Sequence, residues 1–206
     1  YSGTNATINN VAKAVSDGAV VIFDSHGVTD YDEYTGYRDP YGQYVEDCVT
    51  GANTSYLTLT TGNGLTAADK ARVSGKNGTY YHAYSFSSYG TTYYCVDGTV
   101  IANHMEKHAP HSMLWMPICL GMATEGICTP LRAKGVETVY GYSQSVTFAG
   151  DYEYEATFWS SMIEGKTVAE SAAAMKRLHG SWDPAYFAEG TYFNSEAKAQ
   201  RYFIAF

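Results

Sequence analysis

The sequence predicts an α/β protein in which helices cover both faces of a largely parallel β-sheet. Short, continuous apolar runs at 19–23 and 113–118 are typical of strands that are buried on both faces, and a further strand is predicted at 136–142. Segments with helical spacing of apolar residues lie before, between and after these runs. Strands that alternate with helices are joined by crossovers, and crossovers make neighbouring strands parallel.

The helices are predicted from their apolar spacing and from the residues at their ends. Gly18 is a suitable stop for the first helix, and Gly180 for the last. Thr167 and Glu170 form a capping box ahead of the last helix. The predicted helices cover 9–17, 100–108, 124–134, 152–164 and 168–178.

A Tyr-rich insert at about 28–96 interrupts this alternating pattern. Residues 28–52 are acidic, aromatic and punctuated by Gly and Pro, which predicts a long loop. Segments 56–60 and 80–96 carry β-branched and aromatic residues, broken at Gly90, and are predicted as strands or a hairpin. A last strand is predicted at 202–205. We expect a single domain over residues 1–206 that carries this insert.

The composition excludes some partners and suggests a location. The net charge of −8, with 13 Lys and Arg in no basic block, argues against nucleic acid as a partner. The apolar runs are far too short to cross a bilayer, and the first residues show no signal-peptide pattern. With 20 Tyr, 20 Gly and only 17% charged residues, the composition suits an extracellular or cell-surface bacterial protein. Cys48 and Cys95 both lie in the insert and could pair, whereas Cys119 and Cys128 are interpreted as thiols.

Two of the apolar strands end in residues that together can perform nucleophilic chemistry. The run at 19–23 leads to His26 and Gly27, and the run at 113–118 leads directly to Cys119. Parallel strands deliver the groups beyond their carboxyl ends to the same edge of a sheet. An imidazole beside a thiol can take its proton, and the thiolate is the nucleophile. The sequence therefore predicts a His26–Cys119 dyad.

The residues around this dyad resemble the caspase-like cysteine peptidases, a group that includes clostripain, gingipain and legumain. The resemblance lies in Phe23-Asp24-Ser25-His26-Gly27 and Ile118-Cys119-Leu120-Gly121, and it covers about 9–27 and 98–180. It implies a three-layer caspase-like sandwich and a cysteine endopeptidase that acts on protein or peptide substrates. The chain begins close to the His26 strand, so the earlier strands of that fold are missing, replaced or on another chain, and the third alternative would make another chain or a segment of the same precursor a partner. The resemblance implies no cofactor.

Further site residues are expected around the dyad. The backbone N–H groups of Gly27 and Cys119 are expected to hold the oxyanion of the tetrahedral intermediate. The strand at 136–143, including Tyr142 and Ser143, is expected to pair with extended substrate. Asp151, in the loop after that strand, would select Arg or Lys before the cleaved bond, or would simply favour the start of the next helix. Asp24 shares a face with His26 only if its strand stays regular.

Other readings of the sequence compete with the peptidase. His104, His108 and His111 have the spacing of a metal-binding helical face, which would make the chain a metal-dependent hydrolase. The insert at 28–96 could instead be the binding surface of an inactive caspase-like scaffold. An acidic loop could hold calcium, although its spacing is not that of a calcium-binding loop and no metal ligand is assigned. That loop contains Asp30, Asp32, Glu33 and Asp39.

Overall fold

The structure is a computed structural model of the chain. It describes a set of ranges separated by gaps: 1–30, 33–34, 37–38, 44–45, 49–50, 54–72, 84–86, 91–143, 146–179 and 190–193.

A four-stranded sheet forms the centre of the fold, in the order β1-β10-β11-β12. Strands β1 (Val20–Ile22), β10 (Met113–Trp115) and β11 (Thr138–Tyr142) run parallel, whereas β12 (Gly190–Phe193) is antiparallel to β11. The backbone N–H of Phe23 also donates to the Trp115 carbonyl at 2.9 Å, so the pairing of the first two strands continues beyond β1. The predicted α/β class with a mostly parallel sheet is confirmed.

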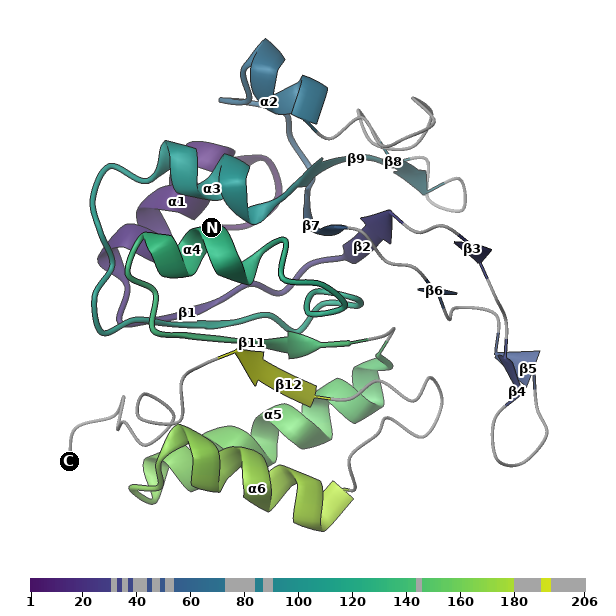
Figure 1. Cartoon of the computed structure of the whole chain (residues 1–206), viewed down its shortest axis with the longest axis vertical. Helices are drawn as coiled ribbons and strands as arrows, with labels where there is room; N and C mark the ends of the chain where they lie inside the picture. Colours follow the sequence, from purple (N-terminus) through teal and green to yellow (C-terminus); the bar gives the residue numbers. More distant parts are fainter. Residues whose placement is uncertain are drawn as a thin grey trace.

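Helices cover both faces of this sheet, as the continuous apolar runs require (Figure 1). On one face lie α1 (Ile8–Asp17), α3 (Gly98–His104) and α4 (Cys128–Ala133), packed on Leu114 and Val139. The other face carries α5 (Phe148–Ile163) and α6 (Val168–His179). Successive residues of β10 point to opposite faces, so Trp115 packs on the α5 side and stacks on Tyr140, with ring centroids 4.0 Å apart.

The insert builds a second, antiparallel sheet that begins where the first one ends. Its order is β2-β7-β9-β8, with β2 at Gly27–Asp30, β7 at Thr54–Leu59, β9 at Thr91–Val96 and β8 at Tyr84–Phe86. The chain therefore passes from the first sheet into the second at His26 and Gly27. Figure 1 shows these strands running away from the carboxyl end of β1.

Smaller elements complete the insert and the amino-terminal region. β3 (Glu33–Tyr34) pairs with β6 (Val49–Thr50), and β4 (Tyr37–Arg38) pairs with β5 (Tyr44–Val45). The prediction of a long loop at 28–52 is therefore wrong where these strands and β2 lie. The hairpin predicted at 80–96 is confirmed by the pairing of β8 with β9. Helix α2 (Ala67–Arg72) and the 3₁₀ turn η1 (Gly3–Asn5) were not predicted.

Helix boundaries differ from prediction where side chains compete for backbone groups. The hydroxyl of Thr124 accepts hydrogen bonds from the backbone N–H groups of Gly126 and Ser55, so 120–127 forms turns and α4 starts only at Cys128. Thr147 caps α5 by accepting from the N–H of Gly150 at 3.0 Å, so this helix begins four residues earlier than predicted. The capping box of Thr167 and Glu170 is present in the predicted place.

At the carboxyl end, the predicted strand 202–205 lies outside the described residues, and β12 was not predicted. Within the described ranges, no helix is both long and apolar enough to cross a bilayer. Cys95 is a buried free thiol, whereas Cys48 lies outside the described ranges.

Candidate active site

The ends of the neighbouring strands β1 and β10 bring the backbones of Gly27 and Cys119 into contact. A Cβ atom placed on Gly27 would lie 1.9 Å from the Cys119 carbonyl oxygen and 3.0 Å from Cγ1 of Ile118. Only glycine, which has no Cβ, permits this approach. The predicted residues His26 and Cys119 therefore belong to two chain segments that touch at the same sheet edge.

Cys119 is a free, half-buried thiol that lies beside the loop leading into α5. Its Sγ atom accepts a hydrogen bond from the backbone N–H of Val146 at 3.4 Å, and its S–H points to the Val146 carbonyl at 3.7 Å. Val146 immediately precedes Thr147, the amino-terminal cap of α5. The sulfur therefore lies next to the backbone that leads into the amino-terminal end of α5.

The residue after Cys119 is held in an unusual backbone conformation. Leu120 has φ of 58°, in the left-handed region that non-glycine residues rarely adopt. This conformation costs about 1–2 kcal/mol. The buried Leu120 side chain holds the turn in place despite that cost. Such outliers cluster at functional sites, where strain fixes the direction of a reactive group.

The imidazole of His26 is exposed and contacts an aromatic ring from the insert. The rings of His26 and Tyr93 meet edge-on, with centroids 5.3 Å apart and planes at 80°. Tyr93 lies on β9 and is half-buried. Sequence reasoning did not find Tyr93, because nothing local in a Tyr-rich segment shows which ring will meet a residue 67 positions earlier.

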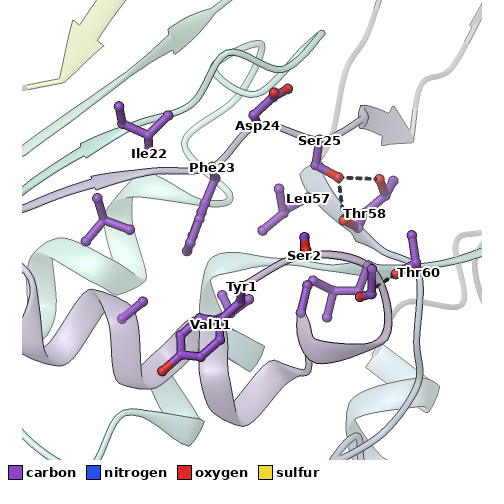
Figure 2. Close-up of a pocket in the computed structure, with 15 residues that line it drawn as sticks. Tyr1, Ser2, Val11, Ile22, Phe23, Asp24, Ser25, Leu57, Thr58 and Thr60 are labelled. Atoms are coloured by element: carbon purple, nitrogen blue, oxygen red, sulfur yellow. Dashed lines mark hydrogen bonds between the residues drawn. The ribbon is translucent and has the colours of Figure 1, made fainter.

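Asp24 and His26 do not share a regular strand. β1 ends at Ile22, and the chain bends at Ser25. Figure 2 shows Asp24 and Ile22 pointing away from the side on which Phe23 lies. The condition for Asp24 to orient His26, a strand that stays regular, is therefore not met.

Asp151 occupies the first turn of α5 and is bound by a residue of the sheet. The hydroxyl of Tyr142 donates to Oδ1 of Asp151 at 2.8 Å. Burial raises the pKa of the Asp151 carboxyl to about 6, and the nearby Glu155 and Asp24 carboxylates act in the same direction. Asp151 is thus a partly buried carboxylate close in sequence to Val146, which contacts the thiol.

The role predicted for Tyr142 is corrected by the structure. Its side chain is fully buried and serves to hold Asp151. Strand β11 lies between β10 and β12, and Tyr142 pairs with Gly190, so the strand has no open edge for substrate. Ser143, the first residue beyond β11, is half-buried and remains a candidate substrate-binding residue.

The histidines that the alternative metal-dependent hydrolase would use as a helical face are not on one helix. Helix α3 ends at His104, because Met105 is extended, so His108 and His111 lie in the turns beyond it. His104 instead contacts Oδ2 of Asp69 and Oδ1 of Asn9, each at 2.9 Å. Among the residues that the structure describes, no group of three His, Cys, Asp or Glu could hold a metal ion.

Only two of the four acidic residues considered for calcium binding lie within the described ranges. Asp30 lies in β2 and Glu33 in β3. Asp32 and Asp39 are outside the described ranges.

A cavity of about 420 Å³ lies between β1, α1 and β7 (Figure 2). Its apolar lining includes Val11, Phe23 and Leu57, and Asp24 and Ser25 form its rim. Neither His26 nor Cys119 lines this cavity. The candidate site is therefore the exposed junction of the two sheets rather than the cavity.

Replacing Gly27 by Ala should separate the two halves of the candidate site. Because the new methyl group would overlap the Cys119 carbonyl, one segment must move by about 1 Å, and such a displacement costs about 100-fold in rate. The measurement is covalent labelling of Cys119 by a peptidyl acyloxymethyl ketone, together with peptide turnover. Gly3→Asn is the control, because Asn tolerates the left-handed backbone of Gly3, whose φ is 54°, and a Cβ there meets no atom within 4 Å. A Gly27→Ala protein with more than about half the parent rate would contradict the contact.

Comparisons of this chain with protein-family models, with curated proteins and with solved structures found no match.

Proposed function

We propose that the chain is a cysteine endopeptidase of the caspase-like type, with His26 and Cys119 as its catalytic dyad. The observation that carries the proposal is the contact of Gly27 with the Cys119 carbonyl, because it joins the segment that leaves β1 to the segment that leaves β10, its parallel neighbour. The helix–sheet–helix layers and the strand order β1-β10-β11-β12 support the caspase-like form of the fold.

In the proposed reaction, His26 takes the proton from the Cys119 thiol, and the thiolate attacks the carbonyl carbon of the scissile peptide bond. The backbone N–H groups of Gly27 and Cys119 stabilise the oxyanion of the tetrahedral intermediate. As this intermediate collapses, His26 gives its proton to the leaving amine, and an acyl group remains on Sγ. His26 then activates a water molecule that hydrolyses the thioester and releases the free thiol.

The direct test is labelling with a peptidyl acyloxymethyl ketone, followed by mapping of the modified residue by mass spectrometry. The proposal requires that Cys119 be the residue labelled and that peptide be cleaved. An inactive scaffold domain would bind peptide without turnover and without labelling. A chain that cleaves peptide while Cys119 stays unmodified would overturn the thiol mechanism.

We propose further that Asp151 gives the enzyme a preference for Arg or Lys before the cleaved bond. A guanidinium can form two charge-assisted hydrogen bonds with a carboxylate in a partly desolvated site. The raised pKa of Asp151, with Glu155 and Asp24 nearby, marks a place where a positive charge would relieve the repulsion between carboxylates. Ser143, directly after β11, remains a candidate substrate contact.

This specificity should depend on pH in a defined direction. Asp151 loses its charge as the pH falls through about 6, so the preference for an Arg substrate over its citrulline analogue should be large at pH 7.5 and small near pH 5. The ratio of the two kcat/KM values, measured across this range, reports the free enzyme.

Asp151→Asn should flatten that ratio at every pH, whereas Glu153→Gln should leave it unchanged. Glu153 lies on the same helix but is 64% exposed and faces His179. A ratio that keeps its pH dependence in the Asp151→Asn protein would reject Asp151 as the selecting group.

A further inference from the structure

The backbone of His26 is held by a threonine of the insert sheet. Thr58, on β7, donates two hydrogen bonds to the His26 carbonyl: one from its backbone N–H at 3.0 Å and one from Oγ1 at 2.9 Å. Thr58 is 2% exposed, so these bonds are shielded from competing water. The preceding residue joins the same network, since Oγ of Ser25 donates to the Thr58 carbonyl at 2.8 Å (Figure 2).

The same strand also holds the loop that follows Cys119. The backbone N–H of Ser55 donates to Oγ1 of Thr124 at 2.8 Å, and the N–H of Thr124 donates back to Oγ of Ser55 at 3.1 Å. The two hydroxyls are themselves 3.1 Å apart. Ser55 is fully buried, which makes this reciprocal pair costly to break.

A residue of the neighbouring strand packs against the side chain of His26. β9 pairs with β7, and its residue Tyr93 packs edge-on against the His26 ring. The insert therefore contacts the candidate dyad at three places: the His26 backbone, the His26 ring and the turn after Cys119.

We propose that strands β7 and β9 of the insert form a brace for the dyad, in which Thr58, Tyr93 and Ser55 are positioning residues. This inference rests on the proposed function, because it assigns these residues to the alignment of His26 with Cys119. His26 lies between the end of β1 at Ile22 and the start of β2 at Gly27, and Cys119 lies beyond the end of β10 at Trp115. The pairing of β2 with β7 continues to the His26 carbonyl, so the brace extends the second sheet to the dyad, and proton transfer between the two groups requires a fixed alignment.

The test compares threonines that make the same kind of hydrogen bond at different places. Thr58→Val removes the hydroxyl that holds His26 and keeps the shape of the side chain, while Thr58→Ser keeps the hydroxyl. Thr60→Val is the matched control, because Oγ1 of Thr60 donates to the Gly3 carbonyl at 2.8 Å and not to a residue of the dyad segments. The measurements are kcat, KM, the thermal midpoint, and the rate at which iodoacetamide alkylates Cys119.

We expect Thr58→Val to lower kcat and the alkylation rate by about tenfold and to leave KM within about twofold. Thr58→Ser should restore both rates to near the parent values. Thr60→Val should lower neither rate. Tyr93→Leu, which removes the ring but keeps an apolar side chain, should also lower both rates, and this second variant decides the matter if Thr58→Val does not fold.

The brace is overturned if Thr58→Val and Tyr93→Leu both fold and lose no more activity than Thr60→Val. It is also overturned if Thr58→Ser behaves like Thr58→Val, because the hydroxyl would then be irrelevant. Failure of the proposed function gives a different result: the parent protein itself would cleave no peptide and resist the acyloxymethyl ketone. The iodoacetamide rates of the threonine variants still separate a brace from ordinary packing in that case.

Discussion

Replacement of Cys119 by Ala is expected to abolish peptide cleavage, with turnover lowered by about four orders of magnitude or more. The thiol is the nucleophile in the proposed reaction, and no other group in the described site can form the thioester. The side chain is half-buried and small, so its removal should leave the fold intact. Turnover of a peptide substrate by the purified variant, with circular dichroism as a check on folding, provides the measurement.

Cys128→Ala is the matched control for this experiment. Cys128 is a fully buried thiol at the start of α4, and burial raises its pKa, which keeps the group protonated and unreactive. Its replacement should cost about 1 kcal/mol of stability through lost packing and leave kcat almost unchanged. Full activity in the Cys119→Ala protein, or loss of activity only in Cys128→Ala, would remove the proposed dyad.

Replacement of His26 by Ala is expected to lower kcat by about three orders of magnitude, because the thiol loses its base and the leaving amine loses its acid. The imidazole is exposed, so the thermal midpoint should change little. Since the site is open to solvent, added imidazole should restore part of the lost activity in the His26→Ala protein. This chemical rescue is a result that a purely structural histidine would not give.

His108→Ala serves as the control for His26, because His108 is also exposed but lies in the turns beyond α3. The roles assigned to His26 fail if both variants have the same kcat. They also fail if the His26→Ala protein keeps its activity but loses stability.

The parallel sheet could be predicted because its signal is local. A strand covered by helices on both faces is apolar at nearly every position; 19–23 and 113–118 show this pattern in the sequence itself, and 136–142 shows it from Val139 onward. The capping box at Thr167 is local in the same way. The start of α4 could not be predicted, because Thr124 turns away from a helix only when Ser55, far away in sequence, is present to bond with it.

The candidate site likewise contains residues that a local sequence signal predicts and residues that only distant contacts place. His26 and Cys119 follow apolar runs, so their position at one sheet edge could be predicted. Thr58 and Tyr93 carry no local signal, since the insert is rich in both residue types and only the pairing of β7 with β9 decides which ones face the site. That β11 has no open edge was missed because β12, which pairs with it, was not predicted, and the Tyr142 side chain is buried by α5 on the face of the sheet.

The reciprocal bonds between Ser55 and Thr124 join residues 69 positions apart, and the bond from Ser25 to Thr58 spans 33. Cys119 and Val146 are 27 apart. Closing such long loops costs entropy before the contacts form, so helices such as α5 and α6 can exist in a chain that has no dyad. During refolding, helix content and thiol reactivity therefore report different stages. The reactivity of Cys119 measures completion of the tertiary structure, whereas the far-ultraviolet circular dichroism spectrum measures helix content.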